Sequence, residues 1–517
     1  MSTGIDTAIA PEPGATPVTL STGPDGTADR DSHAKRWWIL AVLALAQVMV
    51  VLDSTIVNIA LPTAQKALAF DNADRQWVVT GYALAFGSLL LIGGRLADFF
   101  GRKWALLVGL TGFALASAVG GASVNFGMLV TARAVQGAFG ALLAPAVLAL
   151  LTTTFTDPKE RGKAFGIFGG IAGAGASVGL LLGGFLTEYA SWRWTLYVNL
   201  IIAVAAFAGA MIFLPRHERS EDRAGSDTWG TISITAGLFA VVYGFSNAEQ
   251  HGWAAPLTVG SLIAGAVLLL AFVVIEQRVA NPILPLRVVA DRNRGGAFLV
   301  MFLAGIGMFA VFLFLTYYLQ AILGYSAVKS GAAFLPMTGM IIVVASLGSA
   351  VLVTRISSRI LIPIGMTLSA LGLYLLTHIS VTGNYATVVL PASLILGAGL
   401  GLVFAPGFNL AVLGVEPQDS GVASAAVNVM QQIGGSVGTS LFNTIAGTVV
   451  ASYLTAHLGS AAVGSPQYLL AQANAQLHSY TVAFWIAAAV FLGGAVISAL
   501  VLRSGVPEPE GDAVMMH

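Results

Sequence analysis

Two long apolar segments of this 517-residue chain are joined by Gly94-Arg95-Leu96-Ala97-Asp98-Phe99-Phe100-Gly101-Arg102-Lys103, a short and charged turn. Arginine and lysine beside membrane-spanning helices are retained at the cytoplasmic interface. Glycine permits the backbone to reverse direction tightly between two helices. The turn therefore predicts a helical membrane protein in which two consecutive spans form a close hairpin at the cytoplasmic side.

The composition of the whole chain also indicates a membrane protein. Hydrophobic residues make up 56% of the sequence, charged residues make up 9%, and the mean hydropathy is +0.84. A water-soluble globule of this length could not hide so much apolar surface in one core. The net charge is zero without a basic cluster, so we expect no nucleic-acid partner. The absence of cysteine excludes disulfides and thiolate metal sites, and we expect no metal site.

Apolar runs of about 20 residues, the length of a membrane-spanning helix, recur fourteen times between residues 37 and 503. If the N-terminal tail is cytoplasmic, 19 of the 24 Lys and Arg residues fall inside and four outside, while Arg133 lies within a span. This bias predicts a multi-pass protein of the cell (inner) membrane with both termini in the cytoplasm. Residues 1–36 lack apolar periodicity and are expected to form a disordered cytoplasmic tail.

Two short motifs recur at an offset of 259 residues, which indicates an internal repeat. Asp157-Pro158-Lys159-Glu160-Arg161-Gly162 is matched by Glu416-Pro417-Gln418-Asp419-Ser420-Gly421, and Gly175-Ala176-Ser177-Val178-Gly179 is matched by Gly434-Gly435-Ser436-Val437-Gly438. Spans 4 and 5 therefore correspond to spans 12 and 13. An offset of eight spans equals one six-span half plus two inserted spans, and parallel halves around a midplane site are expected of a transporter.

The repeat predicts the domain organisation. We expect an N-terminal six-helix bundle, two inserted helices, a C-terminal six-helix bundle and a second cytoplasmic tail, at residues 37–214, 229–276, 295–503 and 504–517.

Asp53 is the only acid well inside any span. A carboxylate at membrane depth costs on the order of 2.5–3.5 kcal/mol, so we expect it to face a cavity or a partner. Arg133 lies at a matching depth in span 4 and is the natural partner. A guanidinium stabilises a carboxylate and desolvation stabilises the neutral acid, so this pair is the candidate for proton coupling. The alternatives are that Asp53 reaches the interface and that Arg133 only joins helices.

Four segments resemble signatures of the major facilitator superfamily of secondary transporters. Residues 94–103 match G-x-L-[AG]-D-[RK]-x-G-[RK]-[RK] except at Phe99, and residues 52–62 are similar to L-D-x-T-[IV]-V-N-[IV]-A-L-P of the fourteen-span drug:proton antiporters. Residues 133–137 resemble R-x-x-Q-G, and residues 175–184 resemble g-x-x-x-G-P-x-x-G-G with Leu180 in place of proline. The resemblance covers roughly residues 36–503. It implies an all-α integral membrane protein with the major facilitator fold, two six-helix bundles plus two inserted helices.

The resemblance also implies a conformational gate, which locks the two halves while the transporter faces outward. Its residues would be those of the charged turn: Gly94, Asp98, Gly101, Arg102 and Lys103. Small residues at four-residue spacing let helices approach closely. We expect those of span 5 to form a pivot against the other half, with packing alone as the alternative: Gly175, Gly179, Gly183 and Gly184.

Polar side chains follow one face of span 13 and one face of span 1, and lipid cannot accommodate either stripe. At 100° per residue, those of span 13 fall within about 80° of one another. We expect the two stripes and Gln136 of span 4 to line a substrate cavity, with interhelical hydrogen bonding as the alternative. The candidates are Gln47, Ser54, Asn58, Gln136, Asn428, Gln432, Thr439 and Asn443.

The expected function is proton-coupled export of amphipathic drugs or antibiotics by alternating access, and the alternative is export of an endogenous lipid or metabolite. The chain has no G-x-x-x-x-G-K-[ST] phosphate loop, so we expect the proton gradient, without a cofactor, to supply the energy. A membrane enzyme is a rival class, but the longest loops hold no convergent catalytic set. A sensor or channel is disfavoured by the repeated halves. The expected partners are a small amphipathic substrate, protons and the lipid bilayer, and the protein is expected to be a monomer.

Overall fold

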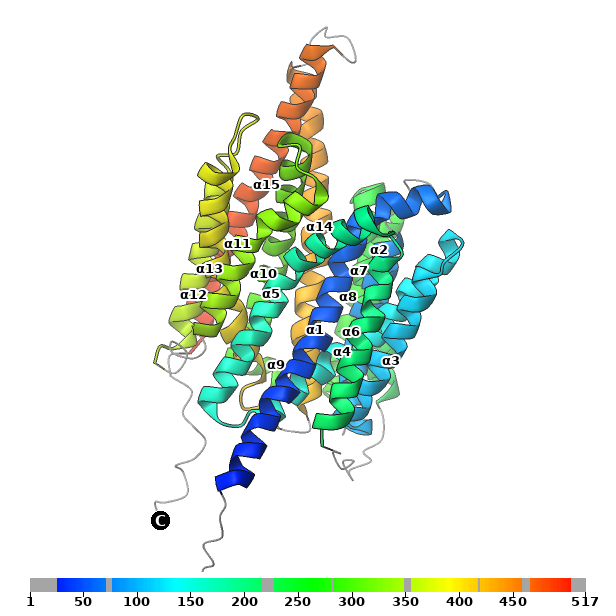
Figure 1. The fold of residues 1–517 in the computed structure, drawn as a ribbon, viewed down its shortest axis with the longest axis vertical. Helices are drawn as coiled ribbons and strands as arrows, with labels where there is room; N and C mark the ends of the chain where they lie inside the picture. Colours follow the sequence, from blue (N-terminus) through cyan, green and yellow to red (C-terminus); the bar gives the residue numbers. More distant parts are fainter. Residues whose placement is uncertain are drawn as a thin grey trace, which may run out of the picture.

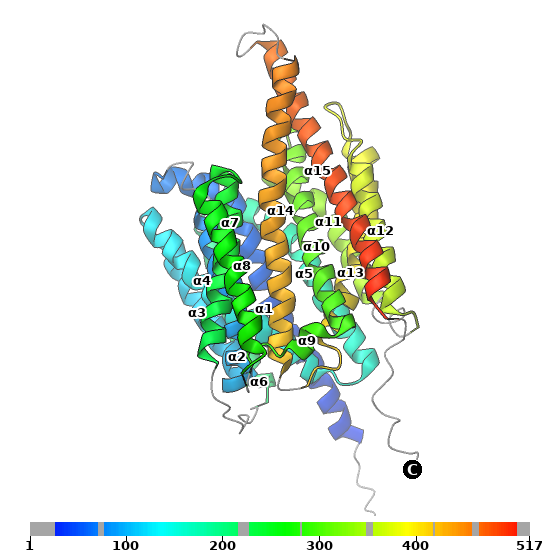
Figure 2. The same ribbon diagram turned by 180° about the vertical axis from the view of Figure 1, so that it is seen from behind.

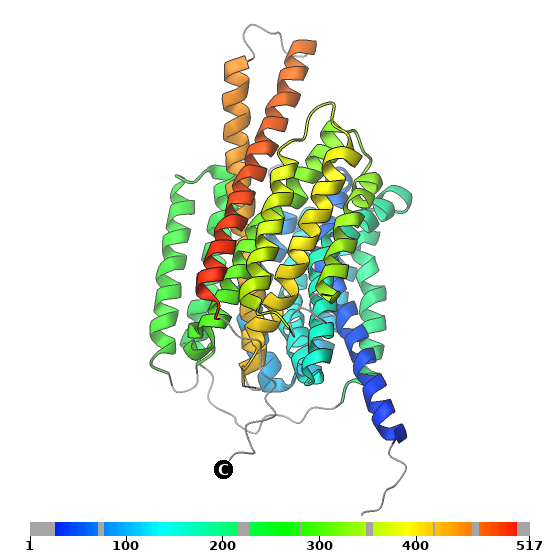
Figure 3. The same ribbon diagram turned by 90° about the vertical axis from the view of Figure 1, so that its left-hand side faces the viewer.

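The computed structural model describes residues 26–70, 77–215, 227–279, 282–347, 355–416, 419–457 and 465–503. Within these ranges the chain folds into helices, as the bilayer requires, because lipid offers no partner for backbone N–H and C=O groups. Figures 1, 2 and 3 show them as one bundle. Their bounds are α1 (Gly26–Leu68), α2 (Trp77–Phe100), α3 (Arg102–Gly121), α4 (Phe126–Thr154), α5 (Pro158–Tyr189), α6 (Trp194–Phe213), α7 (Thr228–His251), α8 (Pro256–Glu276), α9 (Leu286–Ala290), α10 (Arg292–Tyr317), η1 (Tyr318–Ile322), α11 (Ala327–Leu347), α12 (Ser358–Leu376), η3 (Tyr385–Val389), α13 (Leu390–Val412), α14 (Ser420–His457) and α15 (Pro466–Val501).

Fourteen of the described helices, α1–α8 and α10–α15, have at least 19 residues. In the described part of the chain, 13 helices are long and apolar enough to cross a membrane. The remaining one, α5, has 32 residues, of which Val178–Tyr189 forms a shorter apolar stretch. The all-α membrane fold predicted from the sequence is confirmed.

The two halves repeat the same packing. In the first half α1 packs on α5 and α6, α2 on α4, and α3 on α4 and α6. In the second half α10 packs on α14 and α15, α11 on α13, and α12 on α13 and α15. Each of these contacts of the first half becomes one of these contacts of the second half when the helices are shifted by eight spans. The repeat that two short motifs indicated is therefore a repeat of the tertiary structure.

The contacts between the halves follow the same symmetry. Helix α5 packs on α11 and α13, and its counterpart α14 packs on α2 and α4. Two equivalent helices thus each reach across to the opposite half. Such a symmetric interface suits two bodies that rock against each other.

The inserted helices lie beside the boundary of the halves. Helix α7 packs on α2 and α14, and α8 packs on α7. Only 17% of the apolar window of α8 is buried, so most of its surface is left for lipid. Figure 3 shows both helices on one side of the bundle. The boundaries proposed for the folding units stay a prediction.

The bundle has two distinguishable ends. At the end called here the Asp98 end, α2 turns into α3 within one residue, because Gly101 has φ 101°, a conformation that favours glycine. Helix α1 begins and α15 ends at this same end (Figure 1). At the opposite end, called the Tyr317 end, α14 and α15 extend past the other helices (Figure 2).

The N-terminal tail is shorter than predicted. Helix α1 begins at Gly26, so the expectation of disorder was wrong for residues 26–36. No proline follows Pro24 in this stretch, and its Ala, Arg and Lys residues favour helix, so the first helix continues beyond its apolar part. Residues 1–25 and 504–517 lie outside the described residues.

Candidate functional site

A cavity of about 650 Å³ lies between the two halves, which is the size of a site for a drug-sized molecule. Helices α1, α2, α4 and α5 supply one wall, and α10, η1 and α14 supply the other. Most of the wall is apolar, with these polar side chains: Gln47, Ser54, Thr55, Tyr82, Arg133, Thr316, Tyr317, Gln320, Asn428, Gln431, Gln432, Ser436 and Thr439. No residue of α7 or α8 is found in the described part of this wall.

The structure places five of the eight predicted cavity residues in this wall: Gln47, Ser54, Asn428, Gln432 and Thr439. Gln136 and Asn443 are not among the described lining residues, and the side chain of Asn58 lies outside the described part of the chain. The stripe predicted on span 13 thus faces the cavity along most of its length. Whether these residues bind cargo stays a prediction.

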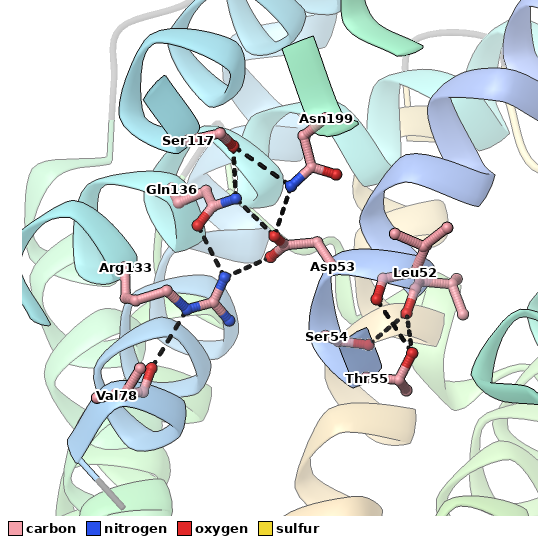
Figure 4. Close-up of polar contacts among 10 residues, drawn as sticks. Leu52, Asp53, Ser54, Thr55, Val78, Ser117, Arg133, Gln136 and Asn199 are labelled. Atoms are coloured by element: carbon pink, nitrogen blue, oxygen red, sulfur yellow. Dashed lines mark hydrogen bonds and ion pairs between the residues drawn. The ribbon is translucent and has the colours of Figure 1, made fainter. Parts of the chain in front are cut away.

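Asp53 is completely buried beside the cavity, in the middle of α1. Its Oδ2 accepts a hydrogen bond from Arg133 Nη1 at 2.5 Å. Its Oδ1 accepts from Gln136 Nε2 and from Asn199 Nδ2, both at 2.7 Å. Figure 4 shows these three donors converging on the carboxylate. Such charge-assisted bonds and a guanidinium offset the desolvation of a buried carboxylate.

A second set of contacts fixes these donors in place. Gln136 accepts from Arg133 Nη1 at 2.7 Å and donates to Ser117 Oγ at 2.7 Å. Arg133 Nε donates to the carbonyl of Val78 at 3.3 Å. The guanidinium also lies 4.4 Å from the centre of the Tyr82 ring, a favourable position for a cation. The cluster around Asp53 therefore joins five helices of the first half: α1, α2, α3, α4 and α6.

Only one member of the Asp53–Arg133 pair is found in the described cavity wall, and this is Arg133. Asp53 lies behind it. Asn199, Ser117 and Tyr82 were not predicted. A signal for Asn199 was available, because it is the only amide in the apolar segment Trp194–Phe213.

The charged turn lies against the second half at the Asp98 end of the bundle. The Asp98 carboxylate lies against Gly421, at the start of α14, where a Cβ on Gly421 would come within 2.5 Å of Asp98 Oδ2. Arg102 Nε lies 3.5 Å from Asp98 Oδ1. The N-terminus of a helix carries partial positive charge, so this position stabilises a carboxylate.

Other contacts confirm that the halves meet at this end. A Cβ on Gly94 would lie 2.8 Å from the carbonyl oxygen of Gly421. Phe168 of α5 packs edge-on against Phe408 of α13, with ring centres 5.5 Å apart. Lys103 behaves differently, since its Nζ donates to the carbonyl of Leu214 within the first half. Lys103 therefore joins parts of one half, and its role in the gate stays a prediction.

A strap of residues 282–288, which includes most of α9, also crosses the Asp98 end. Arg95 of α2 donates to the carbonyl of Pro282 at 3.1 Å, and Glu276 of α8 accepts from the N–H groups of Ile283 and Leu284. A few residues further on, Arg287 pairs with two acids that precede α14. The distances are 3.1 Å to Glu416 and 2.7 Å to Asp419.

The glycines of α5 do not form the pivot expected of them. A Cβ on Gly175, Gly179 or Gly183 would collide with α1, in the same half, at Val51, Thr55 and Ile56. Gly184 is buried as well. Helix α5 lies between α1 and the second half, and this row of small residues is on the face of α5 that packs against α1. Instead, Gly169 and Gly170 face α13 and α11.

Comparison with known proteins gives one consistent result. The profile of the Major Facilitator Superfamily matches residues 43–439. The puromycin resistance protein pur8 of Streptomyces alboniger is 48% identical over 91% of this chain and 92% of its own length. The cephamycin export protein CmcT of Amycolatopsis lactamdurans is 36% identical over 84% and 90%. The tetracenomycin C resistance and export protein of Streptomyces glaucescens is 32% identical over 82% and 78%.

A solved structure supports the fold. The human organic anion transporter MFSD10 has a TM-score of 0.57 and 14% identity, with 90% of this chain and 99% of that chain covered. This likeness concerns the fold alone. The family profile and the relatives together show that the chain is a membrane transporter, not an enzyme, and that it belongs to the major facilitator superfamily.

Proposed function

We propose that this protein exports antibiotic-like amphipathic molecules by alternating access, in exchange for protons that bind at Asp53. The observation that carries the proposal is the buried Asp53–Arg133 pair, which adjoins a drug-sized cavity between two repeated halves. The relatives named for puromycin, cephamycin and tetracenomycin C support this class of cargo. A single chain supplies both walls of the cavity, so a monomer is the proposed transporting unit.

The proton gradient alone would supply the energy, without a cofactor. One proton that moves down 100 mV releases about 2.3 kcal/mol, which is enough for a cargo gradient of about 50-fold. Asp53 suits this role because its charge depends on donors from other helices. When these donors are aligned they favour the carboxylate, and a helix movement that withdraws one of them favours the neutral acid.

The proposed orientation places both termini and the Asp98 end in the cytoplasm, as the distribution of Lys and Arg predicts. The structure would then be an outward-facing state. Its cavity wall includes Leu61, Val79 and Gln320, which lie near the Tyr317 ends of their helices. To reach the inward-facing state, α2 and α14 would separate at Gly94 and Gly421.

Gly94→Val is expected to hold the Asp98 end open. The new side chain would meet the Gly421 carbonyl and the Ala425 side chain. Overpacking of this kind costs about 1–3 kcal/mol, equivalent to a shift of about 5- to 150-fold towards the inward-facing state. Because the chain contains no cysteine, Ser436→Cys in the cavity wall can report accessibility to a membrane-impermeant maleimide from each side.

The matched control is Gly447→Val, also on α14, where no described atom lies within 4 Å of the added Cβ. This control should label like the parent protein. Unchanged labelling from the Asp98 side in Gly94→Val would contradict the proposed closure.

Arg287→Ala is expected to weaken the closure by a smaller factor. Its side chain is 58% exposed, and exposed ion pairs contribute about 0.2–1 kcal/mol, so we expect a shift of about 1.4- to 5-fold. The control is Arg292→Ala. Among the described residues, the Arg292 guanidinium donates only to the carbonyls of Leu500 and Val501, which belong to the same half. The measurement is the same labelling at low and high salt. An equal effect of the two variants would refute a clasp at Arg287.

The cargo class is tested by efflux from proteoliposomes over a panel of puromycin, a cephamycin, tetracenomycin C, and endogenous lipids and metabolites. We expect transport of at least one antibiotic that responds to an imposed pH difference. Transport restricted to the lipids or metabolites would support the alternative exporter.

A further inference from the structure

Three polar atoms of the cavity wall have no hydrogen-bond partner among the described residues. Two of them are buried atoms of lining side chains, the Tyr82 hydroxyl oxygen and Gln47 Oε1. The third is Nη2 of Arg133, whose described bonds use Nε and Nη1 only (Figure 4). Arg133 is 1% exposed and lines the cavity, so this nitrogen is a nearly buried donor at the cavity wall. Unpaired buried polar groups are unfavourable and call for a partner.

We propose that Arg133 and Tyr82 form a subsite for a hydrogen-bond acceptor on an uncharged cargo, such as a carbonyl or ether oxygen. The guanidinium carbon of Arg133 lies over the Tyr82 ring, 4.4 Å from its centre, so the two side chains are direct neighbours in the wall. Gln47 Oε1 offers an acceptor to a second polar group of the same molecule. This proposal rests on the proposed function, since it takes the cavity to be the cargo site.

The charge of the wall selects an uncharged cargo. Arg133 is the only charged side chain in the described wall, and Asp53 compensates it from behind. A cation in the cavity would therefore meet no opposite charge of its own, and its desolvation would be poorly repaid. An uncharged acceptor can use the free donors without bringing in a second charge.

Protonation of Asp53 changes this selection. Among the described residues, the ionisable groups that interact with Asp53 are Arg133 of α4 and Tyr82 of α2, while α3 and α6 present Ser117 and Asn199 to this cluster. Helix α5 presents glycines to this part of α1. A proton on Asp53 thus leaves the positive charge of Arg133 uncompensated at the cavity wall. Anions are then attracted and cations repelled.

A direction of coupling follows from this linkage. A cargo that is exchanged for protons must bind better while Asp53 is ionised. An anion binds better after protonation, so it would bind together with the proton. By this criterion, anions that fit the cavity should not be exchanged for protons.

The subsite is tested by binding of triphenylphosphine oxide, an uncharged aromatic molecule with one strong acceptor, to the purified full chain. Tyr82→Phe removes the donor and keeps the ring over Arg133, so affinity should fall roughly 2- to 12-fold, the range for one neutral hydrogen bond. The control is Tyr374→Phe on α12, which lies outside the described cavity wall and should bind like the parent. Equal affinities of Tyr82→Phe and the parent, with both folded by thermal melting, would overturn the subsite.

The charge selection is tested with two ions of nearly the same shape, tetraphenylphosphonium and tetraphenylborate, at pH 5 and pH 8. Asp53→Asn, which carries no negative charge, should bind the anion more tightly and the cation more weakly than the parent protein does at pH 8. In Asp53→Asn neither affinity should change with pH. Shifts of the same sign for both ions would overturn the charge selection.

The two proposals can fail separately. If Asp53→Asn still accumulates cargo under an imposed pH difference, Asp53 is not the proton site and the proposed function fails. The Tyr82→Phe comparison is made at one pH and still decides whether the acceptor subsite exists.

Discussion

Asp53→Asn is expected to abolish proton-driven efflux while the protein stays folded. Asparagine has the shape of aspartate and keeps one acceptor oxygen for the donors around it, but it does not release a proton. The variant resembles the protonated state that the transport cycle itself requires. The cargo ratio that a gradient of 100 mV supports should therefore fall from about 50-fold to about one.

The measurement is cargo accumulation in proteoliposomes under an imposed pH difference, together with counterflow of labelled cargo without any gradient. Counterflow should persist, because the cavity is intact. Glu188→Gln provides the control, since it removes an exposed acid near the end of α5 and should transport like the parent. Gradient-driven accumulation by Asp53→Asn at the parent level would exclude Asp53 as the proton carrier.

Arg133→Met is expected to cause the largest loss of stability. The change leaves Asp53 as a buried carboxylate without its counter-charge, and breaking such a pair by removing one partner costs about 3–5 kcal/mol. Gln136 and Asn199 still donate to the carboxylate, but they are neutral. Coupling to protons should be lost as well, because Asp53 loses the charged partner beside which it is proposed to exchange protons.

The double variant Asp53→Asn/Arg133→Met separates stability from coupling. With both charges removed, most of the lost free energy of unfolding should return, since the penalty comes from one unpaired charge. Proton-driven efflux should stay absent. The readout is denaturant unfolding in detergent, and simple addition of the two single-variant losses would show that the residues do not interact.

The sequence predicted the features that rest on pattern and charge. The offset of 259 residues predicted which spans correspond, and the contacts of α5 with α11 and of α14 with α2 follow that correspondence. The matching depths of Asp53 and Arg133 predicted their pairing, and the structure joins them directly. These inferences succeed because a lone charge in lipid needs a partner.

Gln136 shows where such reasoning stops. It was assigned to the cavity as a polar residue of span 4, yet it donates to Asp53. Residues three apart lie on one face of a helix, so Gln136 lies on the same face of α4 as Arg133 and reaches the same carboxylate. Asn199 and Ser117 were missed because a single amide or hydroxyl in an apolar span does not reveal its partner.

The close packing of α5 was predictable from its glycines, but the neighbour was not. Small residues at four-residue spacing indicate a helix contact, and α5 has neighbours on two sides. The strap of residues 282–288 could not be predicted from the sequence either. Its helix α9 has five residues, too few for a periodic pattern, and its partners Glu416 and Asp419 lie more than 120 residues away.

The central claim is that cargo leaves in exchange for protons at Asp53. The most direct test records cargo and proton movement together in proteoliposomes, with the membrane potential held at zero by potassium and valinomycin. We predict that cargo accumulates on the acidic side against its own gradient, that protons move in the opposite direction, and that Asp53→Asn shows neither flux. Accumulation that ignores the pH difference, or that proceeds without proton movement, would contradict the claim.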